Sequence, residues 1–209
     1  MSHYNSLHSN VPASQMSSYS SLSGALTYNQ NGSASHPANP LTRKCRVPQT
    51  PYVPSSKWRA QTGRAHPLNG TISFDLIGHQ GQGIPLREVR TRGPQGLQQA
   101  MQGANDRILG HTQLRKIAFH IRWPGYEHSE WIRSIDVVTP QGPITRAQLA
   151  MVISQNFARY IEKHQYEATR EIQWRLSSSG GIKFDHIGLL SLTNVFEDAW
   201  QADVAVEFL

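Results

Sequence analysis

Cysteine, long apolar runs and N-terminal acidic residues are all scarce in this sequence. Cys45 is the one cysteine among 209 residues, so no disulfide can form within the chain, and a reducing compartment fits. The longest apolar runs, such as LAMVI at 149–153, are far shorter than the roughly 20 residues of a membrane span. The start, MSHYNSLHSN, has neither a basic flank nor an apolar run, so we expect no secretory signal. We therefore expect an intracellular protein, cytoplasmic or nuclear, with no membrane contact.

Acidic residues are missing from the first third of the chain. Residues 1–74 hold six of the 20 basic residues and none of the 14 acidic ones, which leaves 14 of each in residues 75–209. The net charge of +6 therefore lies entirely on the N-terminal part. An electrostatic partner of this chain is expected to bind there.

The N-terminal part also differs from the rest in composition. Residues 1–40 are rich in Ser, Asn, Gln, His and Pro, and residues 41–66 add basic residues and prolines. Neither stretch has a period that would bury enough apolar surface to offset the entropy of ordering. We predict a disordered tail over 1–66 and a single globular domain over 67–209.

Several segments of the second part alternate between apolar and polar residues, which predicts strands. They are TISFDLI (71–77), LRKIAFHIRW (114–123), WIRSIDVV (131–138), EIQWRL (171–176) and AWQADVAVEFL (199–209). The second and third are joined by PGYEHSE and resemble an antiparallel hairpin. Residues 90–113 have scattered apolar positions, so we expect a surface loop with a helical turn. Residues 182–192 are apolar, and their pattern does not assign them to one type of secondary structure.

The stretch GPITRAQLAMVI at 142–153 predicts the start of a helix. Thr145 and Gln148 form a capping box, and Ile144 and Leu149 have the spacing of a hydrophobic staple. Apolar residues then recur every three or four positions, at Leu149, Val152, Ile153, Phe157, Tyr160 and Ile161. We place this helix at 146–164 and interpret it as a packing helix. The fold class is therefore α+β, with a mostly antiparallel sheet packed against one long helix.

A set of motifs in this order resembles a known family. They are WPGYE (123–127), Trp131, ITRAQLA (144–150), Trp174, LLSL (189–192) and AWQADV (199–204). The chain over about 115–206 resembles the large family of uncharacterised domains encoded in basidiomycete (mushroom-forming) fungi. The resemblance implies a fungal protein that is intracellular or of unassigned location, and it brings no reaction, cofactor, partner or site residue. Asp198 and Ala199 stand where members often have Ser-Gly.

No motif for catalysis, a cofactor or a metal emerges from the remaining polar residues. Gly78, Gly81 and Gly83 match neither common phosphate-loop spacing. The histidines stand singly rather than at metal-ligand spacing, and His164, on the apolar side of the helix, is expected to be a core or edge histidine with its hydrogen bonds satisfied. Cys45 lies in the predicted tail, which could not hold a base beside it. We predict no cofactor and no metal, and a non-enzymatic protein is favoured over an enzyme of an unrecognised type.

The basic part of the tail is the strongest functional signal. It could contact nucleic acid or an import receptor, with Trp58 stacking on a base. The residues concerned are Arg43, Lys44, Arg46, Lys57, Trp58, Arg59 and Arg64. A solubilising tail is the simpler reading. Our leading hypothesis is a protein-interaction domain with an unknown protein partner; the alternative is RNA or DNA binding through residues 43–64.

Overall fold

The computed structural model describes residues 43–50, 52 and 69–208, which belong to one compact unit, Pro40–Leu209. Its two α-helices are α2 (Leu86–Ala100) and α3 (Arg146–His164). Two short 3₁₀ helices are η3 (Ile172–Trp174) and η4 (Phe184–His186). The strands are β1 (Arg43–Arg46), β2 (Thr71–Ser73), β3 (Ile84–Pro85), β4 (Lys116–Ile121), β5 (Trp131–Asp136), β6 (Val138–Thr139), β7 (Gly142–Pro143), β8 (Ile187–Phe196) and β9 (Ala199–Phe208). The predicted α+β class with a mostly antiparallel sheet is confirmed.

The centre of the seven-stranded sheet is a long hairpin formed by β8 and β9. The strand order is β2-β8-β9-β4-β5, with β3 also paired to β8 and β1 also paired to β9. Each outer edge of the hairpin is thus shared by two shorter strands. β4 runs parallel to β9, while the other pairs of this sheet are antiparallel. The predicted hairpin of β4 and β5 is confirmed, with Ile117 opposite Ile135 and Ile121 opposite Trp131.

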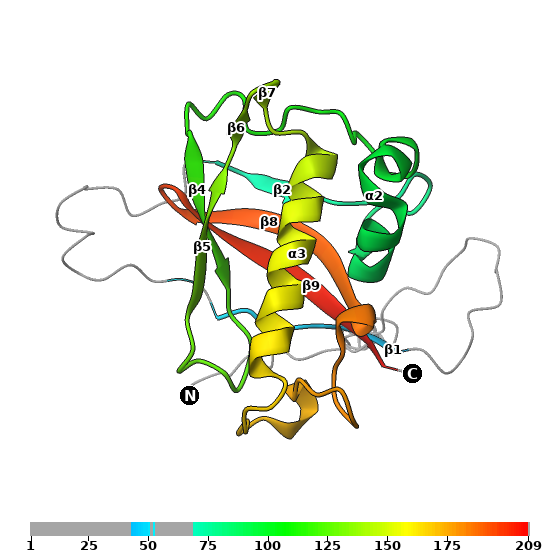
Figure 1. Ribbon diagram of the computed structural model, residues 1–209, viewed down its shortest axis with the longest axis vertical. Coiled ribbons are helices and arrows are strands. Elements are labelled where there is room, and N and C mark those ends of the chain that lie inside the picture. Colours follow the sequence, from blue (N-terminus) through cyan, green and yellow to red (C-terminus); the bar gives the residue numbers. More distant parts are fainter. Residues whose placement is uncertain (1–42, 51, 53–68, 209) are drawn as a thin grey trace, which may run out of the picture. The chain divides into compact units, whose positions relative to one another are not determined.

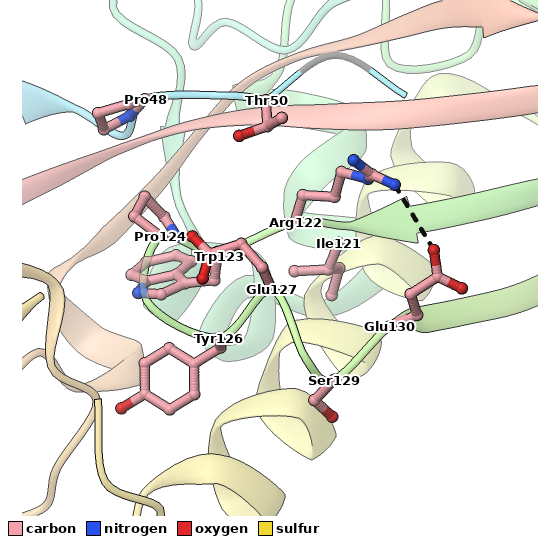
Figure 2. A pocket seen from close by; sticks show the side chains of 10 residues that line it. All are labelled: Pro48, Thr50, Ile121, Arg122, Trp123, Pro124, Tyr126, Glu127, Ser129 and Glu130. Carbon is pink, nitrogen blue, oxygen red and sulfur yellow. Dashed lines mark ion pairs between the residues drawn. The ribbon is translucent and has the colours of Figure 1, made fainter. Parts of the chain in front are cut away.

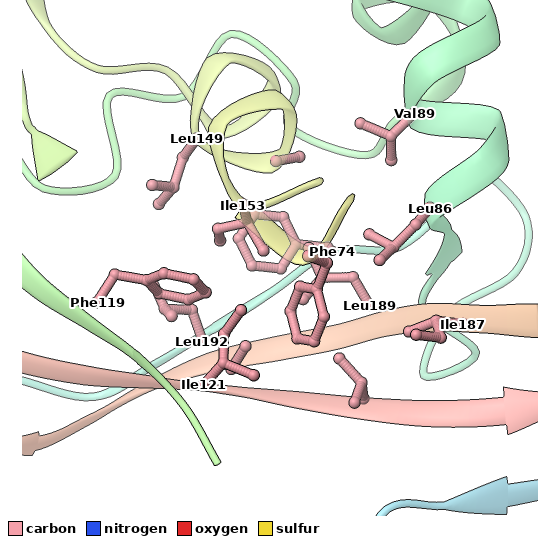
Figure 3. Close-up of a cluster of buried hydrophobic side chains, with 14 of the residues drawn as sticks. Phe74, Leu86, Val89, Phe119, Ile121, Leu149, Ile153, Ile187, Leu189 and Leu192 are labelled. Carbon is pink, nitrogen blue, oxygen red and sulfur yellow. The ribbon is translucent and has the colours of Figure 1, made fainter. Parts of the chain in front are cut away.

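Helix α3 has the bounds that its sequence predicts and crosses one face of the sheet, here called the front face (Figure 1). The capping box is formed: the Gln148 amide donates to the Thr145 hydroxyl oxygen at 3.3 Å, and the Thr145 amide donates to the Gln148 side chain at 2.9 Å. Leu149, Ile153 and Phe157 are at most 1% exposed. Figure 3 shows Leu149 and Ile153 above side chains from the strands, including Phe119 and Leu192. Burying each such side chain is worth roughly 1.5–3 kcal/mol, so this layer is the main source of stability.

Two sequence predictions about local structure are wrong. Residues 86–100 form α2, so the domain has two helices on the front face rather than one long helix. Its backbone breaks at Gly93, where φ is +62°, just before Pro94, and these two residues hide the helical period in the sequence. Residues 171–176 contain η3 (Ile172–Trp174) in place of the predicted strand; Ile172 is 83% exposed whereas Trp174 is buried. The segment 182–192, left open, contributes η4 and the first half of β8.

The predicted disorder of the tail is wrong for residues 43–50. β1 pairs antiparallel with β9, with Arg43 opposite Phe208 and Arg46 opposite Ala205. Val47 continues the pairing through its amide, which donates to the Val204 carbonyl at 2.9 Å, and its side chain is 1% exposed. We call residues 43–50 and 52 the strap. The rest of the predicted tail lies outside the described residues.

Candidate protein-binding site

The turn between β4 and β5 is held by the residues of the WPGYE motif. The Trp123 indole donates to the Trp174 carbonyl at 2.8 Å, and the Leu176 amide donates to the Tyr126 hydroxyl oxygen at 3.1 Å. Gly125 has φ +81°, and a Cβ there would lie 2.0 Å from the Thr169 hydroxyl oxygen, so only glycine fits. These side chains tie the turn to residues 169–176, and their role is structural.

A small polar pocket lies beside this turn (Figure 2). Arg122 and Glu130 form an ion pair in it at 3.5 Å, and Pro48 and Thr50 of the strap line its other side. Backbone hydrogen bonds, chiefly from the Gly125 amide, lower the pKa of Glu127. The pocket has a volume of about 60 Å³, enough for a few water molecules. Because ligand pockets usually measure about 300–1,000 Å³, it is too small for a metabolite.

Ser129 at the edge of this pocket is hydrogen-bonded to His164. The Ser129 Oγ lies 2.7 Å from His164 Nε2, and His164 Nδ1 lies 2.7 Å from the Tyr160 carbonyl oxygen. Since a carbonyl only accepts, Nδ1 carries a proton, and Nε2 lies within hydrogen-bond distance of the serine hydroxyl. A serine–histidine pair of this kind can activate a nucleophile. His164, however, is fully buried against Tyr160 and cannot deliver the proton to a leaving group. The prediction of a satisfied core histidine is confirmed.

Strand β5 forms one end of the sheet. The Val137 amide donates to the Arg115 carbonyl, and the Ala118 amide donates to the Asp198 carbonyl beside β9. Backbone groups alternate in direction along a strand. Odd-numbered residues of β5 therefore bond to β4, whereas the N–H and C=O groups of Ile132, Ser134 and Asp136 point outward. Within the described part of the chain, no strand pairs with this outer edge.

The outer edge of β5 is partly protected by one side chain. The Arg133 guanidinium donates to the Ile132 carbonyl at 2.8 Å and lies 4.1 Å from the centre of the Trp131 ring. Charged side chains on an edge strand are a common protection against unwanted strand pairing. The neighbouring Ile132 is nevertheless 40% exposed. The edge therefore combines outward-pointing backbone groups, an exposed apolar residue and one arginine side chain that a partner strand could displace.

A second hollow, of about 280 Å³, lies on the back face of the sheet beside β5. Ala118 and Ile132 belong to this face because they alternate with the core residues Phe119 and Trp131. The other lining residues come from the strap, from β4, from the adjoining ends of β8 and β9 and from the turn between them, namely Tyr52, His120, Phe196, Glu197, Asp198 and Ala199. We call this hollow the back-face hollow.

The charges around the back-face hollow are mainly negative. Burial, and then the nearby Arg122, lower the pKa of His120 below its usual 6.5, so this ring is neutral at pH 7. The His120 and Tyr52 rings lie 4.7 Å apart, and Arg122 lies over Tyr52 at 5.6 Å. Arg122 is also paired to Glu130. Glu197 and Asp198 have no ion-pair partner among the described residues.

The structure gives two of the predicted basic contact residues partners within the domain. The Lys44 amine donates to the Gln82 carbonyl, and the Arg46 guanidinium pairs with Asp203, a buried carboxylate. Arg43 lies in β1. The other predicted contact residues, Lys57, Trp58, Arg59 and Arg64, lie outside the described residues. Nucleic-acid or import-receptor binding through residues 43–64 therefore stays a prediction.

The remaining candidates from the sequence acquire simple structural roles. The Gly83 amide donates to Asp75 Oδ1 at 2.9 Å, so a carboxylate occupies the place a phosphate would need. Cys45 lies in β1, half-buried against the core, rather than in a disordered tail. The described residues contain no group of three His, Cys, Asp or Glu side chains that could hold a metal. Among them, no helix combines the length and apolar character that crossing a membrane requires.

Comparisons with known proteins give no match. No family model, no curated protein and no solved structure is similar to this chain. The resemblance to the fungal family therefore stays a prediction from the sequence motifs.

Proposed function

We propose that this chain is a protein-interaction domain that binds an extended segment of a partner protein by adding it as a strand to the outer edge of β5. The observation that carries the proposal is the row of outward-pointing backbone groups at Ile132, Ser134 and Asp136. An extended peptide can pair with such a row, and pockets for its alternate side chains then give specificity. The exposed Ile132 side chain and the adjoining back-face hollow offer such contacts.

The proposal requires Arg133 to leave the Ile132 carbonyl when a strand is added, because both would use the same acceptor. The guanidinium bond is a single side-chain hydrogen bond at the surface, worth about 0.5–1.5 kcal/mol net. Several backbone hydrogen bonds from an added strand exceed this cost. Arg133 would thus disfavour weak or poorly matched partners without closing the edge.

The test begins with selection of decapeptides from a random display library on the full-length chain. The decapeptide with the strongest fluorescence-anisotropy signal is then measured against Ser134→Pro and Ser134→Val. Proline removes the outward N–H without removing a bond to β4, whereas valine keeps that N–H. We expect Ser134→Pro to weaken binding by roughly tenfold or more and Ser134→Val to change it little.

Two further readouts accompany this pair. Arg133→Ala should strengthen binding by roughly threefold, because the added strand no longer competes with the guanidinium. Residue-resolved amide exchange by NMR should show new protection at Ser134 and Asp136 when the decapeptide is added to the unmodified chain. If no decapeptide binds, or if these two amides gain no protection, strand addition at β5 is wrong. Because the exchange measurement uses the unmodified chain, it tests strand addition at β5 even if Ser134→Pro fails to fold.

A further inference from the structure

We infer that the back-face hollow receives an arginine side chain of the partner segment, an inference that rests on the proposed strand addition. An added strand would lie about 4.8 Å beyond β5. Its residue next to Ile132 on the back face would point over Ile132 toward His120, the residue opposite Ile132 on β4, with Ala118 two positions away on the same face of β4. Since the hollow lies over β5 and β4, a long side chain of the added strand could reach it across β5, whereas a short one could not.

The lining of the hollow suits the aliphatic stem and the planar head of arginine. Ala118 and Ala199 are the small residues of the lining, and Ile132 contributes to it from β5. Phe196 contributes aromatic atoms to the lining, against which a guanidinium packs favourably. A stem of methylene groups would cover the exposed Ile132 side chain while the charged head lies further in.

The charge at the far side of the hollow is complementary to arginine. Glu197 and Asp198 stand in the β8–β9 turn and have no ion-pair partner in the described part of the chain. Arg122, the cation that the described residues place near the hollow, is already paired with Glu130, and His120 is neutral at pH 7 because burial lowers its pKa. A partner carboxylate would meet two like charges here, whereas a guanidinium can bond to a carboxylate with two parallel N–H groups. Lysine offers no such planar fork and stacks less well, so arginine is favoured.

The test uses the selected decapeptide together with its arginine-to-lysine and arginine-to-glutamine versions. Against the full-length chain, we expect the glutamine version to bind roughly tenfold more weakly and the lysine version to fall between the two. Two variants of the chain then locate the arginine. Ala118→Leu fills part of the hollow, and Asp198→Asn removes one carboxylate while keeping the backbone carbonyl that bonds to Ala118. Each should weaken the arginine peptide by roughly fivefold and leave the glutamine peptide unchanged.

The matched control is Asp185→Asn, an exposed carboxylate on η4 outside the hollow, which should bind all three peptides like the unmodified chain. The inference is overturned if the three peptides bind equally, or if Ala118→Leu and Asp198→Asn have no effect on the arginine peptide. Strand addition itself would still stand in that case, provided that Ser134→Pro weakens binding. If light scattering shows that a second copy of the chain occupies this edge and the decapeptide displaces it, the occupant is this chain and our assignment of a partner protein is wrong.

Discussion

The two faces of the sheet are held by different kinds of contact. On the front face, α2 and α3 cover a layer of apolar side chains that includes Phe74, Leu149 and Ile153, each at most 1% exposed (Figure 3). On the back face, polar side chains add to the backbone pairing of the strap with β9: Arg46 bonds to Asp203, and Gln49 and Thr50 bond to Gln201. Stability from apolar area is spread over many residues, whereas polar attachment depends on a few matched pairs.

This difference indicates that the front face mainly stabilises the domain, whereas the back face is available for binding. The front face supplies the cohesion that keeps the β8–β9 hairpin in place. The back face carries the hollow, the titratable His120 and the strap, where single substitutions can change binding without unfolding the domain. Substitutions on the two faces should therefore differ in the size and in the kind of their effects.

The largest effect is expected from Phe157→Ala on the front face. Phe157 is 1% exposed and lies 6.4 Å from Phe119, ring centre to ring centre. Removing the ring leaves a cavity that should lower the free energy of unfolding by about 3–5 kcal/mol. Chemical denaturation measures this, with Val152→Ala, a half-buried position on the same helix, as the milder control. A loss below about 1 kcal/mol would contradict the view that this layer holds the domain together.

A smaller effect is expected from Arg46→Ala on the back face. The Arg46 side chain is 71% exposed and the Asp203 side chain 10% exposed, so solvent screens much of their attraction. We expect a loss of about 1 kcal/mol in the free energy of unfolding, while Arg46→Lys should retain part of it because the charge remains. If Arg46→Ala were as damaging as Phe157→Ala, the contrast between the two faces would fail.

The smallest effect concerns the pH dependence of the back face. The pKa of His120 is lowered by burial and by Arg122, against the opposing charges of Glu130 and Asp198. A lowered folded-state pKa means that the stability present above pH 6.5 is lost as the pH falls through 6.5 toward the folded value. Thermal unfolding midpoints should therefore drop between pH 7.5 and pH 5. The drop should be smaller in His120→Phe, and an identical drop in both proteins would show that His120 is not its source.

The sequence predicts the front face better than the back face for a physical reason. Helix α3 and strand β9 bury apolar stripes whose periods are local, and the capping box lies within four residues, Thr145–Gln148. Helix α2 escapes prediction because Gly93 and Pro94 interrupt the period and the helix survives through packing of Leu86, Val89 and Leu97. The apolar residues Ile172 and Trp174 stand two positions apart, which predicts a strand with both side chains buried on one face. In the structure they lie in η3, where Trp174 is buried and Ile172 is exposed.

The strap and the candidate site could not be predicted from local patterns. Arg46 reads as part of a basic tail, since its partner Asp203 lies 157 positions away. The edge of β5 becomes visible only with the strand order, and the parallel pairing of β4 with β9 has no local signal. The hollow likewise joins residues from the strap, four strands and a turn. The sequence does predict β5 itself, though not that it would be the outermost strand.

The late position of β9 in the sequence has a consequence for biosynthesis. β9 joins β8 to both β4 and β1, yet all three of these strands leave the ribosome before it. Until Ala199–Phe208 has emerged, β1 and β4 have no neighbour at the centre, and their apolar groups remain open to other chains. Contacts between residues so distant along the chain form slowly. The nascent chain should consequently depend on chaperones until Phe208 has emerged, and a stop codon before Ala199 should yield an aggregating fragment rather than a smaller folded domain.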